Sequence, residues 1–161
     1  MQNLTEQQQQ ILTERRIASV ATLSPQGFPH LTSVWFVLED GRFLLSVPSN
    51  SAKARNITDN ASISILIDTR GTYTAAGISV QGTARLVSAD EAREIGKKVH
   101  AKYSKPEALA DPAVSGFFET MDDAAIILEP EKWIFWDMAE LDQQVFAGAL
   151  AEQQAFFEIV P

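Results

Sequence analysis

The sequence predicts a mainly β protein in which short antiparallel strands form a barrel and a few helices pack outside it. Short segments rich in Val, Ile, Leu and Phe follow one another closely, and tight turns at 24–27 and 39–41 separate the first of them. The order lacks the strand–helix alternation of a parallel sheet, and no glycine-rich dinucleotide fingerprint follows a strand. A β-barrel with peripheral helices is therefore favoured over a Rossmann fold.

The composition is that of a globular protein: of 161 residues, 45% are hydrophobic and 21% are charged. No internal repeat and no linker rich in Gly, Ser or Pro divides the chain. We therefore expect one domain over 1–161, with its core over about 11–137 and a tail at 138–161.

Charge and residue usage exclude several classes of function. The net charge of −8 disfavours binding to nucleic acid or to an anionic membrane. No apolar run approaches the roughly 20 residues that span a bilayer, and the N-terminus lacks the pattern of a secretory signal. With no cysteine and two distant histidines, a metal site is not expected, and the predicted location is cytoplasmic.

The apolar patterns locate the individual elements. Strands are expected at 17–23, 30–38, 42–47, 61–68, 77–87, 124–128 and 133–137, the last two interrupted by Pro130. Helices are expected at 4–14 with Thr5 as its cap, near 51–58, from residue 90 onward, at 112–121 and in the tail 138–157. Gly82 marks a bend or a close backbone approach. His100 is expected to be exposed, and 121–123 is expected to be a solvated turn.

Residues 46–56 carry the chemistry of an anion site. A strand ends at Val47, Pro48 blocks its continuation, and three good N-cap residues follow. A helix that begins there presents free N–H groups and the positive end of its dipole to a phosphate. Ser51 adds a hydroxyl and Lys53 an ammonium. Arg55 either reaches the phosphate or pairs with Asp59, and a plain capped helix is the alternative interpretation.

Five segments in order resemble the flavin-binding split-barrel proteins related to pyridoxamine 5′-phosphate oxidase. They are 17–23 (IASVATL), 27–36 (GFPHLTSVWF), 44–47 (LLSV), 51–57 (SAKARNI) and 80–87 (VQGTARLV), with a weaker sixth at 128–136 (LEPEKWIFW). The resemblance implies a split β-barrel, a six-stranded antiparallel Greek-key barrel with flanking helices. It also implies a homodimer with two cofactors at the interface.

The resemblance further implies a set of cofactor-binding residues. The strand under the flavin ring would contribute Thr32, Ser33, Val34 and Trp35; the strand end Ser46 and Val47 would lie near the ribityl chain; and Ser51 and Lys53 would hold the phosphate, with Arg55 as a further candidate. From the partner subunit, Gln81 or Trp136 would approach the flavin.

Two departures separate this sequence from pyridoxamine-phosphate oxidases proper. Those enzymes have a phosphate-binding arginine where Ala52 stands, and their substrate motif with Arg and His has no match in 138–161. The stretch around Lys53 is also similar to the branch that uses the deazaflavin F420, in which an arginine often stands in place of Ser51. This difference favours FMN.

The function that follows is an FMN-dependent oxidoreductase of an unidentified small molecule, with NAD(P)H as the electron source. Because a flavin carries the hydride itself, such a site needs no acid–base pair, and no catalytic residue is identified. His30 beside the flavin edge is one candidate proton donor, weighed against a structural role. The alternatives are an F420-dependent reductase of the same fold and a non-catalytic module that binds flavin or haem.

Overall fold

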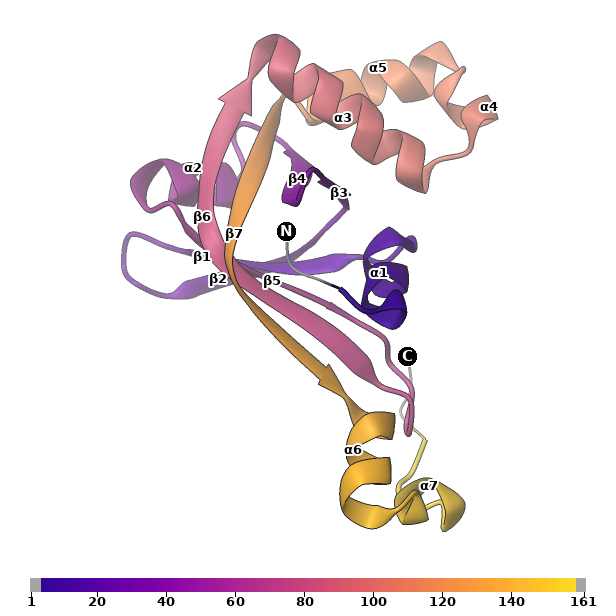
Figure 1. Ribbon diagram of the computed structural model, residues 1–161. Coiled ribbons are helices and arrows are strands. Elements are labelled where there is room, and N and C mark those ends of the chain that lie inside the picture. The colour runs from indigo at the N-terminus through magenta and orange to yellow at the C-terminus, as the bar shows by residue number, and fades with distance from the viewer. Residues whose placement is uncertain (1–3, 159–161) are drawn as a thin grey trace.

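Antiparallel strands and outer helices make up the computed structural model, which describes residues 4–158 (Figure 1). The strands are β1 (Ala18–Leu23), β2 (Pro29–Val34), β3 (Phe36–Glu39), β4 (Arg42–Val47), β5 (Ser62–Asp68), β6 (Ala76–Ser88) and β7 (Ala124–Asp137). The helices are α1 (Glu6–Thr13), α2 (Ala52–Asp59), α3 (Ala89–Tyr103), α4 (Pro106–Leu109), α5 (Pro112–Met121), α6 (Met138–Phe146) and α7 (Ala149–Glu152). The mainly β class with flanking helices is confirmed.

The seven strands form one antiparallel sheet in the order β2-β1-β5-β6-β7-β4-β3. The resemblance implies six strands, whereas the sheet has seven; the single strand predicted at 30–38 divides at Trp35, and the two predicted at 124–128 and 133–137 are one. Before Trp35 the chain pairs with β1, and after it with β4. The outermost strands of the sheet, β2 and β3, are thus consecutive in the chain. The sheet therefore curls into a barrel that is split between β2 and β3, at Trp35.

The barrel interior holds the main hydrophobic core. In β5 the isoleucines 63, 65 and 67 are buried, as the alternation in the sequence predicts. They meet side chains from other strands that are fully covered, among them Val20, Phe36, Phe43, Leu45 and Ile78. Burial of this apolar surface is the main source of the barrel's stability.

Strand β7 runs without a break through Pro130, so the two strands predicted at 124–128 and 133–137 are one. The pairing with β6 shifts between Gln81 and Gly82, where Gly82 pairs with Pro130 and Gln81 with Lys132. The extra residue of this β-bulge is Glu131, which is left unpaired. The regular ladder is thus interrupted next to Pro130, which has no N–H to donate to it. A Cβ on Gly82 would lie 2.1 Å from the carbonyl oxygen of Glu129, which confirms the close backbone approach.

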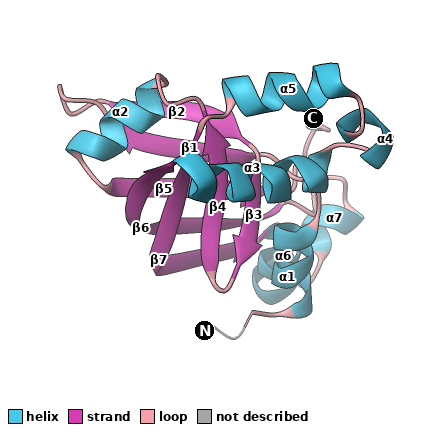
Figure 2. Cartoon of the chain, turned by 90° about the horizontal axis from the view of Figure 1, so that it is seen from above, coloured by secondary structure: helices cyan, strands magenta, loops and turns pink. Residues whose placement is uncertain are grey.

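Helices α3 and α5 lie side by side over one end of the barrel, as Figure 2 shows from above. The apolar stripe of α3, formed by Ala92, Ile95 and Val99, is buried against β4 and β7. His100 is buried as well, which corrects the expectation that it is exposed. Gly96 lies one turn before His100 on the same side of α3, and both residues are buried.

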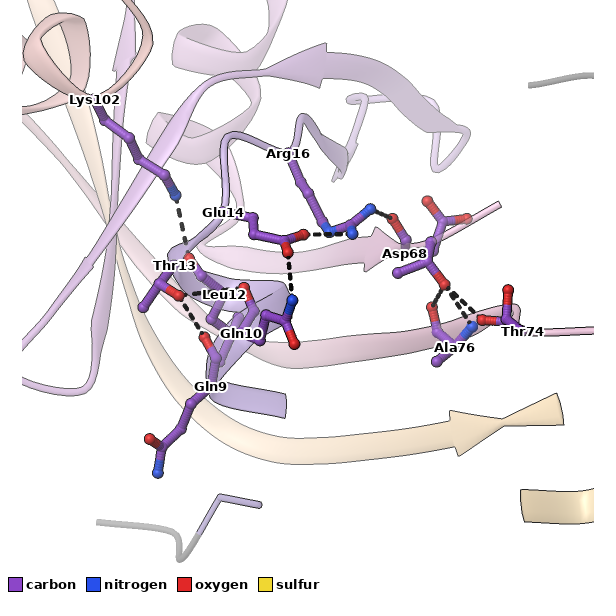
Figure 3. Close-up of polar contacts among 11 residues, drawn as sticks. Gln9, Gln10, Leu12, Thr13, Glu14, Arg16, Asp68, Thr74, Ala76 and Lys102 are labelled. Carbon is purple, nitrogen blue, oxygen red and sulfur yellow. Dashed lines mark hydrogen bonds and ion pairs between the residues drawn. The ribbon is translucent and has the colours of Figure 1, made fainter. Parts of the chain in front are cut away.

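Helix α1 packs against β3, β5 and β6 and is held by long polar side chains (Figure 3). Thr5 caps it in a capping box with Gln8, as the sequence predicts for Thr5. Lys102 of α3 donates to the carbonyl of Leu12 (3.1 Å), and Arg16 donates to the carbonyl of Asp68 (3.1 Å). These bonds tie the segment before β1 to α3 and β5.

The tail forms α6 and α7, which extend from the barrel on the side away from α3 and α5 (Figure 1). Asp142, itself buried, accepts from the amides of Leu150 and Ala151 and so holds the two helices together. No helix within residues 4–158 is both long and apolar enough to cross a membrane.

Candidate functional site

The end of β4 leads into α2 through a tightly held loop. Ser51 is the N-cap, and its Oγ accepts from the amide of Ala54 (3.2 Å). The amide and Oγ of Ser49 both donate to the carboxylate of Asp123, each at 2.7 Å. The first-turn amides of Ala52 and Lys53 have no acceptor within the helix. The predicted helix start is therefore present, with Ser51 already engaged as its cap.

A pocket of about 380 Å³ opens beside this helix start. We call it the strand-end pocket; it is lined by Ile17, Ser33, Val34, Trp35, Ser46, Val47, Pro48, Lys53, Val99 and Asp122. Six residues predicted to bind the cofactor share this pocket, namely Ser33, Val34, Trp35, Ser46, Val47 and Lys53. They come from β2, from Trp35 between β2 and β3, from β4 and from α2, which are separate in the sequence and meet at this pocket.

Two polar groups of the strand-end pocket lack partners within the described chain. Ser46 is buried, and its Oγ makes no hydrogen bond. Lys53 forms no salt bridge with any residue in 4–158. Burial lowers the pKa of the Lys53 ammonium, and the negative charge of Asp122 acts in the opposite direction. An unpaired cation and an unpaired hydroxyl in one pocket suit a ligand that is both anionic and hydrogen-bonding.

Trp35 is fixed in the pocket wall by the residues behind it. Its ring stacks on Tyr103 of α3 with 4.9 Å between centroids and an interplanar angle of 5°. The Tyr103 hydroxyl accepts from the amide of Phe36 (3.3 Å) and donates to the carbonyl of Arg16. Burial raises the pKa of that hydroxyl. The stack therefore holds the point at which the barrel splits in one conformation.

His100 and Asp122 form a pair that the sequence analysis missed. The His100 Nε2 and the Asp122 Oδ2 lie 2.8 Å apart, and the imidazole stacks on Phe118 at 4.0 Å between centroids. Asp122 had been expected in a solvated turn, and it is instead partly buried on the wall of the strand-end pocket. No local pattern signals this pair, because the two residues are 22 positions apart in the chain.

Five predicted site residues do not line the strand-end pocket. Thr32 pairs with Val20 on the β1–β2 ladder, and its Oγ1 is buried without a partner among the described residues. Arg55 donates to the carbonyl of Asn50 (2.5 Å), and no salt bridge joins it to Asp59 within residues 4–158. Ser51 serves as the helix cap described above.

The remaining two, Gln81 and Trp136, lie on β6 and β7. Gln81 is exposed and pairs with Lys132, whereas the Trp136 ring covers Gly77 and is 38% exposed. Either residue is predicted to approach the flavin of the other subunit in a homodimer, and that prediction concerns a second copy of the chain. His30 is half-buried on β2 and does not line the pocket. Among residues 4–158 no group of three or more His, Asp or Glu side chains could hold a metal ion.

Comparison with solved structures identifies the fold. A conserved hypothetical protein of Mycobacterium tuberculosis, Rv2991, superimposes with a TM-score of 0.71 at 27% identity, over 86% of this chain and 88% of that one. An F420 reductase gives a TM-score of 0.64 at 20% identity, over 81% and 98% of the two chains. HutZ, a haem storage protein of Vibrio cholerae, gives 0.66 at 17% identity, over 84% and 95%.

The last two likenesses, both below 25% identity, show the shared fold alone, a split barrel of antiparallel strands with flanking helices. No curated protein sequence matches this chain. The family profile described as pyridoxamine 5′-phosphate oxidase matches residues 4–137, which is most of the chain. By this match the protein belongs to the pyridoxamine 5′-phosphate oxidase family.

Proposed function

We propose that the protein is an FMN-dependent oxidoreductase of a small organic molecule. One observation carries the proposal: the strand-end pocket, beside the start of α2, is lined by Lys53, which forms no salt bridge within residues 4–158, and by Ser46, whose buried Oγ has no partner there. A phosphate placed at a helix N-terminus meets both free N–H groups and a favourable dipole. The residues present therefore fit the phosphate and ribityl chain of a flavin.

In this proposal each part of the pocket has a defined task. Lys53 and the amides of Ala52 and Lys53 hold the phosphate, while Ser46 bonds a ribityl hydroxyl. The β2 backbone at Ser33 and Val34 lies along the polar edge of the ring. FMN supplies hydride transfer when bound, and NAD(P)H is the proposed electron donor. The protein's contribution is to position the cofactor and to exclude water from it.

A homodimer is part of the proposal. Proteins of this fold commonly form dimers. The side chains of Ile134 and Trp136 on β7, and of Leu141 on α6, are exposed although they are large and apolar. An interface over this row would cover the apolar surface and bring Trp136, and with it Gln81, toward the partner's cofactor.

An F420-dependent reduction is the second candidate, and the charge balance of the pocket favours it. The lining of the strand-end pocket contains one cation, Lys53, and one anion, Asp122. Their charges cancel, which suits the singly charged phosphodiester of F420 better than the doubly charged phosphomonoester of FMN. The F420 reductase that shares the fold supports this candidate. Haem is less well supported, because no histidine lines the pocket.

Cofactor titrations of the purified dimer test the proposal. Flavin fluorescence quenching with FMN and riboflavin, alongside F420, gives the order of affinity. The Lys53→Ala variant should lose about 10- to 100-fold in affinity for FMN, the range expected for one charge-assisted hydrogen bond, and little for riboflavin. Lys105→Ala, which removes an exposed lysine outside the pocket, is the matched control.

Three results would reject the FMN proposal. One is the absence of FMN binding to the wild-type protein. The second is an equal loss for FMN and riboflavin in Lys53→Ala. The third is tighter binding of F420 than of FMN, which would transfer the assignment to the second candidate. With FMN bound, bleaching of the flavin absorbance on addition of NADPH or NADH then tests turnover directly.

A further inference from the structure

A second pocket of about 450 Å³ lies between α3 and the helices α4 and α5. We call it the helical pocket; its walls include Gly96 and His100 from α3, Leu109 from α4, and Ser115 and Phe118 from α5. Its volume is within the range of small-molecule sites, roughly 300–1,000 Å³. None of its residues was among those predicted to bind the cofactor.

The cations of the helical pocket are already neutralised within α3. Arg93 pairs with Asp90, and Lys97 pairs with Glu94, each at 2.7 Å and three residues apart. Both cations lie at the exposed rim. The interior of the pocket therefore offers an anionic ligand no buried cationic partner, since both cations are solvated at the rim.

Two of the carboxylates around the helical pocket are also engaged. Asp122 is bound to His100, and Asp123 accepts twice from Ser49. Glu119 is the third and is exposed at the rim, where water solvates it. A cationic ligand consequently finds no free carboxylate inside the pocket, and burying an unpaired charge there would be costly.

The interior of the helical pocket is mainly apolar, and the Ser115 hydroxyl supplies its hydrogen-bonding group. Phe118 and Leu109 line it with carbon, while the space beside Gly96 is taken by the side chains of Ser46 and His100, since a Cβ there would lie 3.3 Å from the Ser46 Oγ. The Ser115 hydroxyl donates to the carbonyl of Asp111 (3.2 Å) and keeps acceptor capacity. The complementary ligand is a flat, uncharged molecule with a polar substituent.

We propose that the helical pocket binds a neutral, ring-containing organic molecule. Asp122 lines both this pocket and the strand-end pocket, and His100 stands directly beside it. The ligand would thus lie across the Asp122–His100 pair from the cofactor. Because that pair stands between them, a ligand in the helical pocket does not exchange a hydride with the flavin, and its binding does not rest on the proposed oxidoreductase function.

Three naphthalene probes that differ in charge test the proposal on the full-length protein without cofactor: 2-naphthol, 2-naphthoate and 2-naphthylmethylamine. Binding is followed through the backbone amide signals of Gly96 and Ser115 in NMR titrations. We expect 2-naphthol to shift both signals and to bind at least about tenfold more tightly than either charged probe, because only the charged probes must bury an unpaired ion.

Pocket-filling variants locate the binding site. Ser115→Trp should abolish the 2-naphthol shifts, whereas Ala113→Trp, on the same helix but outside the pocket, should preserve them. Leu109→Trp fills the same space from α4 and serves if Ser115→Trp does not fold. Equal affinity for the three probes, or 2-naphthol binding that persists in a folded pocket-filled variant, would overturn the proposal, as would a lack of binding to the wild type.

The Lys53→Ala variant separates this proposal from the cofactor assignment. It should bind 2-naphthol with unchanged affinity even where FMN affinity is lost. Should FMN fail to bind the wild type while 2-naphthol binds as expected, the helical pocket stands and the FMN assignment falls. The reverse pattern overturns the helical pocket alone.

Discussion

His100 Nε2 and Asp122 Oδ2 lie 2.8 Å apart, and this pair forms the wall between the two pockets. The imidazole comes from α3 and the carboxylate from the segment after α5, so the pair fastens α5 to the helix that packs on the barrel. Phe118 stacks on the imidazole and strengthens the same junction. The geometry of both pockets therefore depends on this contact.

Removal of the His100 side chain should destabilise the protein. His100→Ala leaves Asp122 without its partner and opens a cavity beside Phe118, which together cost about 2–4 kcal/mol in the free energy of unfolding. Urea denaturation followed by circular dichroism measures the change. Lys97→Ala, an exposed position on the same helix, should stay within about 0.5 kcal/mol. An equally small change for His100→Ala would contradict the role of the pair.

Asp122 should weaken the binding of a doubly charged phosphate. Asp122→Asn keeps an acceptor for His100 and removes the negative charge that faces the same pocket as Lys53. We expect FMN affinity to rise about three- to tenfold, with riboflavin affinity unchanged. Glu119→Gln removes a charge nearby without touching the strand-end pocket and should leave both affinities as they are. Parallel gains in FMN affinity for the two variants would attribute the effect to net charge.

Gly82 should not tolerate a side chain. The Cβ of Gly82→Ala would meet the Glu129 carbonyl at 2.1 Å and the Leu128 Cδ1 at 2.9 Å, so β7 must move away at the bulge. We expect a loss of about 2 kcal/mol or more in the free energy of unfolding. Gly116→Ala, within α5, meets nothing within 4 Å and should stabilise by about 0.4–1 kcal/mol. Comparable losses for the two variants in urea titrations would show that the close approach is not the cause.

Lys102 should make the stability depend on pH in the alkaline range. Its Nζ lies 3.9 Å from the centroid of the Phe36 ring and donates to Leu12 (Figure 3), and burial lowers its pKa to about 8. The unfolded chain keeps this proton up to about pH 10.4. Between about pH 8 and pH 10.4 the unfolded state therefore binds more protons, and the free energy of unfolding gains a term that rises with pH.

Comparison with Lys102→Met isolates that term. The wild type should gain stability relative to this variant as the pH rises from about 8 to about 10.4, and the difference should stay constant below about pH 8, where both states are protonated. Lys105→Met removes an exposed lysine and should show no such trend. Urea titrations at several pH values measure it, and a difference that does not vary with pH would exclude the buried ammonium as its source.

Local patterns predicted most of the secondary structure. The alternation of isoleucines over 63–67, the Thr5 cap and the Ser51 helix start each depend on neighbours in the chain, and each is present in the structure. The start of α2 was predicted for the same reason, because cap residues and free amides act within one turn. Whether that start binds a phosphate is a proposal that the titrations above decide.

The sequence by itself determined the antiparallel β class, the flanking helices and the capped start of α2, since these follow from periodicity and capping over a few residues. The tertiary structure alone decided three further features. The strand predicted at 30–38 divides at Trp35, whose ring stacks on that of Tyr103, a residue far away in the chain. Strand β7 passes through Pro130 with a bulge at the next residue, Glu131, which is unpaired opposite the Gln81–Gly82 step of β6. His100 and Asp122 form a pair, and a second pocket opens beside them, because packing of α5 on α3 brings distant residues into contact, which no local pattern encodes.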